Sequence, residues 1–294
     1  MSLISEARKR YHQRLVEEGV LAITSGSGGC LIASNADKSN KPSKDIALQV
    51  AQALGAKEAS EKQKGQTAGK KFEKITAQFI TETFLRLSHL RPGNWEVLDL
   101  GNANNIKTSN FSQYSHLEAL LNLQKQHREL TVSLGNNYLV APDIVVFRHL
   151  CSDEEINKGI EIVGDSVCLR SDLRKQDWNV PHPVLHASIS AKWTMRSDRA
   201  QNSRTEALAL IRERKGRLPH IVVVTGEPTP SRLASLALGT GDIDCVYHFA
   251  LNELIDAVDS YSKNGREDMM ELLQVLIDGK RLKDISDLPL DLCV

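Results

Sequence analysis

The sequence has few cysteines, and no two of them are spaced as a metal-binding or redox pair. Five cysteines occur among 294 residues, an odd number, and none belongs to a C-x-x-C motif. They are Cys30, Cys151, Cys168, Cys245 and Cys293. This pattern argues against a disulfide framework and a zinc ribbon, and it is typical of a reducing cytoplasm.

Long apolar runs are also missing. No run approaches the ~20 residues of a membrane span, and the charged start MSLISEARKRYHQRL is typical of a helix rather than of a signal peptide. The glycine-rich stretch 25–29 lacks the Gly-Lys-Ser/Thr ending of a P-loop. We therefore expect no membrane association and no P-loop.

Neither sign of charge is in excess, because 37 basic residues balance 37 acidic ones. A neutral chain argues against nucleic-acid binding, which favours a basic surface. The distribution is uneven, however. Residues 192–217 contain eight basic and three acidic side chains, a local excess of five positive charges. A neutral protein with one basic face remains compatible with DNA binding.

Strand-like and helical segments alternate in the C-terminal half. The β-branched runs are 139–148, 185–193, 220–225 and 243–249, and the helical segments are 199–213, 230–238 and 251–262. We interpret 151–183, with its Gly and Pro punctuation, as an irregular excursion. The alternation predicts an α/β fold with helices flanking a central mixed sheet.

The N-terminal half is interpreted as mainly helical. Apolar residues recur at helical spacing from Phe72 to Leu87, in a helix that begins after Gly65-Gln66 and ends before Arg91. Further elements are expected as helices at 4–18, 44–54 and 114–130, a strand at 95–100 and a loop at 24–43. No repeat or linker divides the chain, so we expect one domain over residues 1–294.

Two neighbouring strand segments carry a carboxylate and a lysine. Pro142-Asp143 opens the apolar run 144–147, and Ser190 and Lys192 share one face of the next strand because side chains alternate along it. A carboxylate and a lysine so placed suit metal-assisted phosphodiester hydrolysis. The arrangement resembles the PD…(D/E)xK signature of a nuclease superfamily, with Ser190 at the position of the second acid.

The missing acid has a candidate on the following helix. Glu206 lies fourteen residues after Lys192, and we expect it to hold one or two Mg²⁺ ions together with Asp143 and the backbone carbonyl of Ala191. Lys192 would position the attacking water and stabilise the phosphate. Glu73 is a candidate for orienting a ligand or the lysine. A turn at Pro-Asp, a chance Ser-x-Lys triplet and a solvated helical glutamate are the alternatives.

A cluster of DNA-reading side chains follows the lysine strand directly. Arg196 and Arg199 can each donate two hydrogen bonds to guanine, and Asp198 between them can accept from cytosine N4. The alternative is a solvated helix start with Asp–Arg salt bridges. Together with the catalytic candidates, the cluster favours a sequence-specific DNA endonuclease.

The motifs closely resemble those of the NgoMIV family of type II restriction endonucleases. The resemblance is most specific in SIS-A-KWT-RSDRAQN-R-E at 188–206, RKGRLPHIVVVT at 214–225 and GKRLKDISDLPLDL at 279–292. SNAD at 34–37 and PDI-V at 142–146 match too. Ala191 departs from the cysteine of the family pattern. A metal contact through the backbone carbonyl would survive that change.

The resemblance implies a PD-(D/E)xK fold whose second acid has migrated to the helix. It also implies recognition of the palindrome GCCGGC in double-stranded DNA, with cleavage after the first G to leave 5′-CCGG overhangs. Two Mg²⁺ ions per active site and a homotetramer of two back-to-back dimers are further implications. The host would be bacterial, with the enzyme in its cytoplasm.

The resemblance also implies a role for each DNA-reading residue. Arg196, Asp198 and Arg199 would read the central CCGG from the major groove, and Gln66 would contact the minor groove. Asp37 and Arg232 would read the outer G·C pairs.

Two other functions fit parts of the pattern. A DNA-binding protein that does not cut would keep the reading residues, but Asp143, Lys192 and Glu206 together argue against it. A PD-(D/E)xK repair nuclease would keep the catalytic residues, but the R-S-D-R cluster argues for sequence reading.

Overall fold

The computed structural model describes residues 2–294 with several gaps. The residues outside the description are 1, 27–28, 60–62, 64, 102–106, 128–141, 176–181, 196, 240 and 264–266.

A six-stranded mixed sheet forms the centre of the molecule, in the order β3-β4-β5-β6-β7-β8. The strands are β3 (Trp95–Asp99), β4 (Ile144–Arg148), β5 (Val184–Lys192), β6 (His220–Thr225), β7 (Cys245–His248) and β8 (Leu282–Asp284). The β3–β4 and β4–β5 pairs are antiparallel, and the remaining pairs are parallel. The predicted α/β fold with a central mixed sheet is therefore confirmed.

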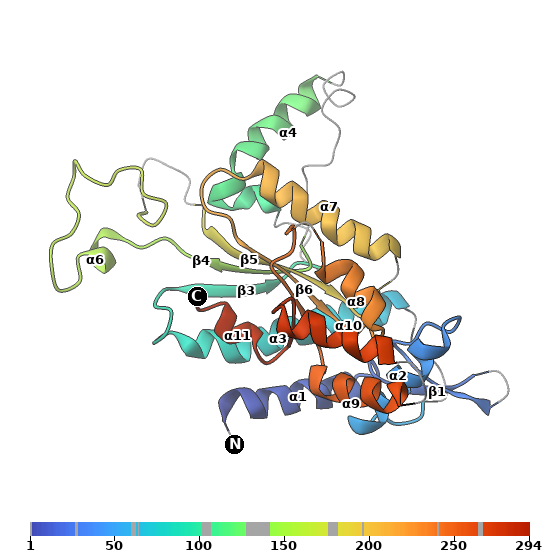
Figure 1. Ribbon diagram of the computed structural model, residues 1–294. Coiled ribbons are helices and arrows are strands. Elements are labelled where there is room, and N and C mark those ends of the chain that lie inside the picture. Colours follow the sequence, from blue (N-terminus) through green and yellow to red (C-terminus); the bar gives the residue numbers. More distant parts are fainter. Residues whose placement is uncertain are drawn as a thin grey trace.

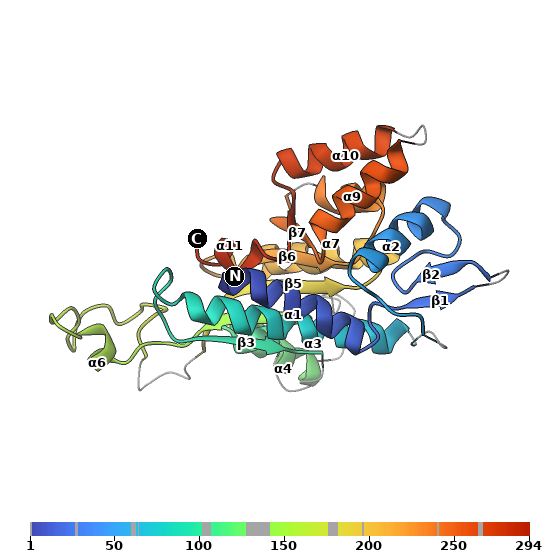
Figure 2. The same cartoon turned by 90° about the horizontal axis from the view of Figure 1, so that it is seen from below.

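Helices cover both faces of this sheet (Figure 1). In Figure 1, α3 (Gly65–Phe84) and α1 (Leu3–Glu17) lie below the sheet, and α7 (Ser197–Glu213) lies above it. Figure 2 shows α1 and α3 side by side across the lower face. Along α3 the buried side chains are Phe72, Ile75, Phe79 and Ile80. The apolar residues that recur at helical spacing in the sequence therefore form the face of α3 that packs into the core.

The structure describes seven further helices and three 3-10 turns. They are α2 (Lys41–Ala53), α4 (His116–Gln126), α6 (Asp153–Ile156), α8 (Pro230–Ala237), α9 (Leu251–Ser262), α10 (Glu267–Asp278) and α11 (Leu288–Asp291), with 3-10 turns η2 (Leu85–Leu87), η3 (Thr108–Asn110) and η4 (Ser112–Tyr114). No helix among the described ranges is both long and apolar enough to cross a membrane.

The prediction of a loop at 24–43 is wrong. This stretch contains most of a two-stranded hairpin, β1 (Ile23–Ser25) paired with β2 (Leu31–Ala33), and the first turn of α2. Strands of three residues are too short to show a periodic pattern. The side chain of Asn40 accepts a hydrogen bond from the Ser43 N–H and caps α2, with a proline in its first turn, so the helix begins earlier than 44.

The predicted excursion after β4 is an arm that projects from the sheet (Figure 1). Its described residues, 149–175, contain the short helix α6 and no long element. The Arg174 guanidinium organises the arm, because it donates to both carboxylate oxygens of Asp153 at 2.6 Å and to backbone carbonyls of the arm. Ile160, Ile162 and Val167 on the arm are exposed.

Candidate active site and DNA interface

The sheet brings Asp143 and Lys192 together, because the start of β4 lies beside the end of β5 in their antiparallel pairing. Asp143 Oδ2 accepts from Lys192 Nζ at 2.6 Å and from the Ala191 N–H at 2.8 Å. Ser190 Oγ lies 3.4 Å from the same oxygen. Both charged side chains are 18% exposed, so the ion pair is partly shielded and still accessible.

The end of β5 is held from the neighbouring strand. The Thr225 hydroxyl donates to the Lys192 carbonyl at 2.8 Å, and the Gly226 N–H donates to it at 3.3 Å. These bonds fix the backbone from which the Lys192 side chain leaves. Thr225 is the last residue of the predicted strand 220–225, whose bounds the structure confirms.

Two further carboxylates approach this pair from helices on opposite faces of the sheet. Burial is the main cause that raises the pKa of Glu206 on α7, and the charge of Asp143 adds to it while Lys192 opposes it. Burial likewise raises the pKa of Glu73 on α3 to about 7, with contributions from Asp143 and Asp99 and opposition from Lys192. Both glutamates therefore respond electrostatically to the Asp143–Lys192 pair.

Sequence reasoning missed Asp99, which contributes to the same cluster. Asp99 ends β3, and its Oδ1 accepts from the Gly101 N–H at 3.0 Å. A Cβ at position 101 would lie 2.6 Å from Glu73 Oε2 and 3.2 Å from Asp99 Oδ1, so glycine there admits the Glu73 carboxylate. Asp99 could have been found from the sequence, because it is an acidic residue at the end of the predicted strand 95–100.

The donor chemistry of the cluster fits a hard divalent cation. Asp143, Glu73, Glu206 and Asp99 offer carboxylate oxygens, the ligands that Mg²⁺ prefers. Burial is the main cause of the raised pKa values of the two glutamates, and a bound cation would favour their ionised forms. Among the residues that the structure describes, no three His, Cys, Asp or Glu side chains are grouped as a formed metal site. Asp143 is instead bound to Lys192.

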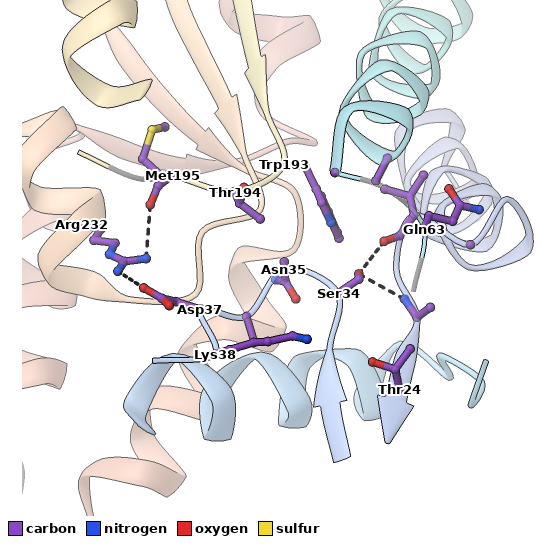
Figure 3. A pocket seen from close by; sticks show the side chains of 16 residues that line it. Thr24, Ser34, Asn35, Asp37, Lys38, Gln63, Trp193, Thr194, Met195 and Arg232 are labelled. Carbon is purple, nitrogen blue, oxygen red and sulfur yellow. Dashed lines mark hydrogen bonds and ion pairs between the residues drawn. The ribbon is translucent and has the colours of Figure 1, made fainter. Parts of the chain in front are cut away.

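Asp37 and Arg232, 195 positions apart in the sequence, meet as an ion pair (Figure 3). Asp37 follows β2, and Arg232 lies in the first turn of α8. The Arg232 contact is the largest cause that holds the pKa of Asp37 well below its usual range, and Ser39 adds two hydrogen bonds to the same carboxylate. Arg232 Nη1 also donates to the Met195 carbonyl at 3.3 Å.

This ion pair borders a cavity of about 480 Å³ that begins one residue beyond Lys192. Trp193, Thr194 and Met195 line it just beyond the end of β5 (Figure 3). Gly65 lines it at the start of α3. Gln66, the next residue of α3, is exposed. The active-site strand and the first turn of α3 thus open onto one concave surface.

The R-S-D-R cluster is only partly described. Arg196 lies outside the described residues. Asp198 and Arg199 belong to the first turn of α7, and their side chains are outside the description. The helix predicted at 199–213 begins in the structure at Ser197, two residues before the predicted start.

The motif at 34–37 is tied to the end of β6. Asn35 is buried, and its Nδ2 donates to the Gly226 carbonyl at 2.7 Å. The neighbouring Ser34 hydroxyl donates to the Val20 carbonyl. Asn35 and Ser34 therefore fix the loop that carries Asp37.

Two comparisons with known proteins agree over almost the whole length. The sequence model of a family described as NgoMIV restriction enzyme matches residues 11–294. The chain is 48% identical over 292 residues to the type II restriction enzyme NgoMIV of Neisseria gonorrhoeae, with 99% of each protein covered. The matched range contains every predicted catalytic and DNA-reading residue.

Proposed function

This chain belongs to the NgoMIV restriction enzyme family and is thus a type II site-specific deoxyribonuclease, and from this premise we propose that it cleaves both strands of GCCGGC with Mg²⁺. Cleavage after the first G would leave 5′-CCGG overhangs. The observation that carries the hydrolytic part is the Asp143–Lys192 pair beside two partly buried glutamates.

The proposed chemistry divides the work between the metal and the chain. Bound Mg²⁺ would neutralise the carboxylates and polarise the scissile phosphate. Asp143 and Glu206, with the carbonyl of Ala191, are the proposed holders of two ions. Lys192 would orient the attacking water and stabilise negative charge on the phosphate, because its ammonium is fixed by Asp143 at 2.6 Å. Glu73 would orient these groups from α3.

Ser190 takes no metal in this proposal. Its hydroxyl lies 3.4 Å from Asp143 Oδ2 and from Ser203 Oγ, so it adds a polar contact that helps to hold Asp143. The carboxylate that the superfamily pattern places at position 190 would come from Glu206.

The Asp37–Arg232 ion pair supports outer G·C reading. Aspartate accepts from cytosine N4 and arginine donates to guanine O6 and N7, so a paired Asp and Arg is complementary to one G·C pair. Arg196, Asp198 and Arg199 are proposed to read the central CCGG, and Gln66 the minor groove.

The proposed assembly is a homotetramer of two dimers. A palindromic site calls for two subunits related by a two-fold axis. The arm supports a second association surface, because Ile160 and Ile162 are 69% and 59% exposed on it and exposed apolar clusters are typical of interaction sites. A restriction enzyme meets incoming DNA inside a bacterium, so we propose a cytoplasmic location.

One incubation tests the proposal. A plasmid with GCCGGC and a matched plasmid without it are incubated with the protein and Mg²⁺, and the new ends are sequenced. We expect cleavage of the first plasmid alone, with 5′-CCGG ends, and none in EDTA. Binding without cleavage would indicate the non-cutting DNA-binding protein, and cleavage of both plasmids would indicate the repair nuclease.

A further inference from the structure

Glu227 is a buried carboxylate outside the predicted catalytic and DNA-reading residues. It lies in the four-residue connection from β6 to α8 and is 1% exposed. An ionised group taken out of water is costly unless it is well paired. A carboxylate at this position therefore needs partners.

Its hydrogen bonds join two segments that border the DNA-reading residues. Oε1 accepts from the N–H of Thr229 at 3.1 Å and from its hydroxyl, which shapes the turn before α8. Oε2 accepts from the N–H of Met195 at 3.2 Å, just past the end of β5. Met195 directly precedes the R-S-D-R cluster in the sequence.

The same carboxylate faces Arg232. Arg232 Nη1 lies 3.6 Å from Glu227 Oε2, while Nη2 is bound to Asp37. The Met195 carbonyl accepts from Nη1 as well. Two carboxylates and one carbonyl thus hold the guanidinium from different sides and fix its plane, as bidentate base reading requires.

We propose that Glu227 is a positioning residue for sequence reading, which orients Arg232 for the outer G·C pair. This inference rests on the proposed role of Arg232. Glu227 acts through Arg232 and the backbone and does not contact DNA, because the burial of its side chain leaves no room for a base.

Glu227→Gln is the informative change. It keeps the size of the side chain, removes the charge that faces Arg232, and turns one acceptor oxygen into a donor. Either Met195 or Thr229 then loses the acceptor for its N–H. We expect the preference for GCCGGC over ACCGGT, measured as the ratio of binding constants, to fall on the order of tenfold.

The experiment measures binding of the full-length protein to duplexes that carry GCCGGC or ACCGGT, with Ca²⁺ in place of Mg²⁺ to limit cleavage. Because Glu227 acts through Arg232, the double variant E227Q/R232A should discriminate no worse than R232A. Glu227→Asp keeps the charge and should retain an intermediate preference, and it serves as the second variant if E227Q does not fold.

Asp284→Asn is the matched control. Asp284 is another buried carboxylate, 5% exposed, and it binds Arg8 rather than a predicted DNA-reading residue. The Asp284→Asn variant should have a lower melting temperature but the same preference for GCCGGC over ACCGGT as the wild type. Equal weakening of both duplexes by E227Q, or independent effects of E227Q and R232A, would overturn the inference. A wild-type protein that does not prefer GCCGGC would overturn the proposed outer-pair function, and this inference with it.

Discussion

Replacing Glu73 by glutamine should stabilise the metal-free enzyme above pH 7 and have little effect on its stability at pH 4.5. The reason is the cost of an ionised Glu73, whose pKa is raised to about 7 by burial and by the charges of Asp143 and Asp99. A raised pKa means that the folded state holds the proton more tightly than the unfolded state. Stability from this group is therefore lost as the pH rises from about 4.5 to about 7.

The magnitude follows from the same pKa. A rise from 4.5 to about 7 corresponds to about 3 kcal/mol at ~1.4 kcal/mol per pKa unit. Glu73 is half-buried, so solvent screening reduces this to about 1–3 kcal/mol. At roughly 2 °C per kcal/mol for a chain of this size, E73Q should melt about 2–6 °C above the wild type at pH 8.

Thermal unfolding in EDTA at pH 4.5 and pH 8 is the assay, with Mg²⁺ added in a second series. Mg²⁺ should stabilise the wild type more than E73Q at pH 8, because the ion neutralises the carboxylate that the variant lacks. A control variant, Lys74→Gln, alters an exposed charge on the same helix and should leave the difference between the two pH values unchanged. Equal melting shifts for E73Q at both pH values would refute the electrostatic argument.

The remaining predictions concern catalysis, recognition and assembly. Lys192→Ala and Glu206→Ala should each abolish cleavage with Mg²⁺ while specific binding survives in a gel-shift assay; wild-type cleavage by E206A would show that the acid has not migrated to α7. Arg232→Ala should cost about 1–3 kcal/mol of binding to GCCGGC, and an equal loss on every sequence would indicate a phosphate contact instead. Ile160→Asp combined with Ile162→Asp should reduce the mass in light scattering from four chains to two and remove the faster cleavage of plasmids with two sites. An unchanged mass would exclude these two residues from the tetramer contact.

Local patterns in the sequence were sufficient for the centre of the fold. The β-branched run 220–225 and the helical spacing at 251–262 predicted β6 and α9 with the bounds that the structure has, because strand and helix periods are properties of neighbouring residues. Because the prediction used only neighbouring residues, it missed elements that are too short to show a period. The hairpin β1–β2 is too short for a period, and β8 and α11 at the C-terminus were not predicted at all.

The chemistry of the site divides in the same way. Asp143 and Lys192 could be recognised from the sequence because Asp143 directly precedes an apolar run and Lys192 ends a strand whose polar and apolar side chains alternate. Their ion pair required the antiparallel pairing of β4 with β5, which no local pattern specifies. Asp37 and Arg232 meet across 195 positions of sequence, and Glu227 joins two connections that follow different strands. Such contacts depend on how the elements pack, so only the tertiary structure decided them.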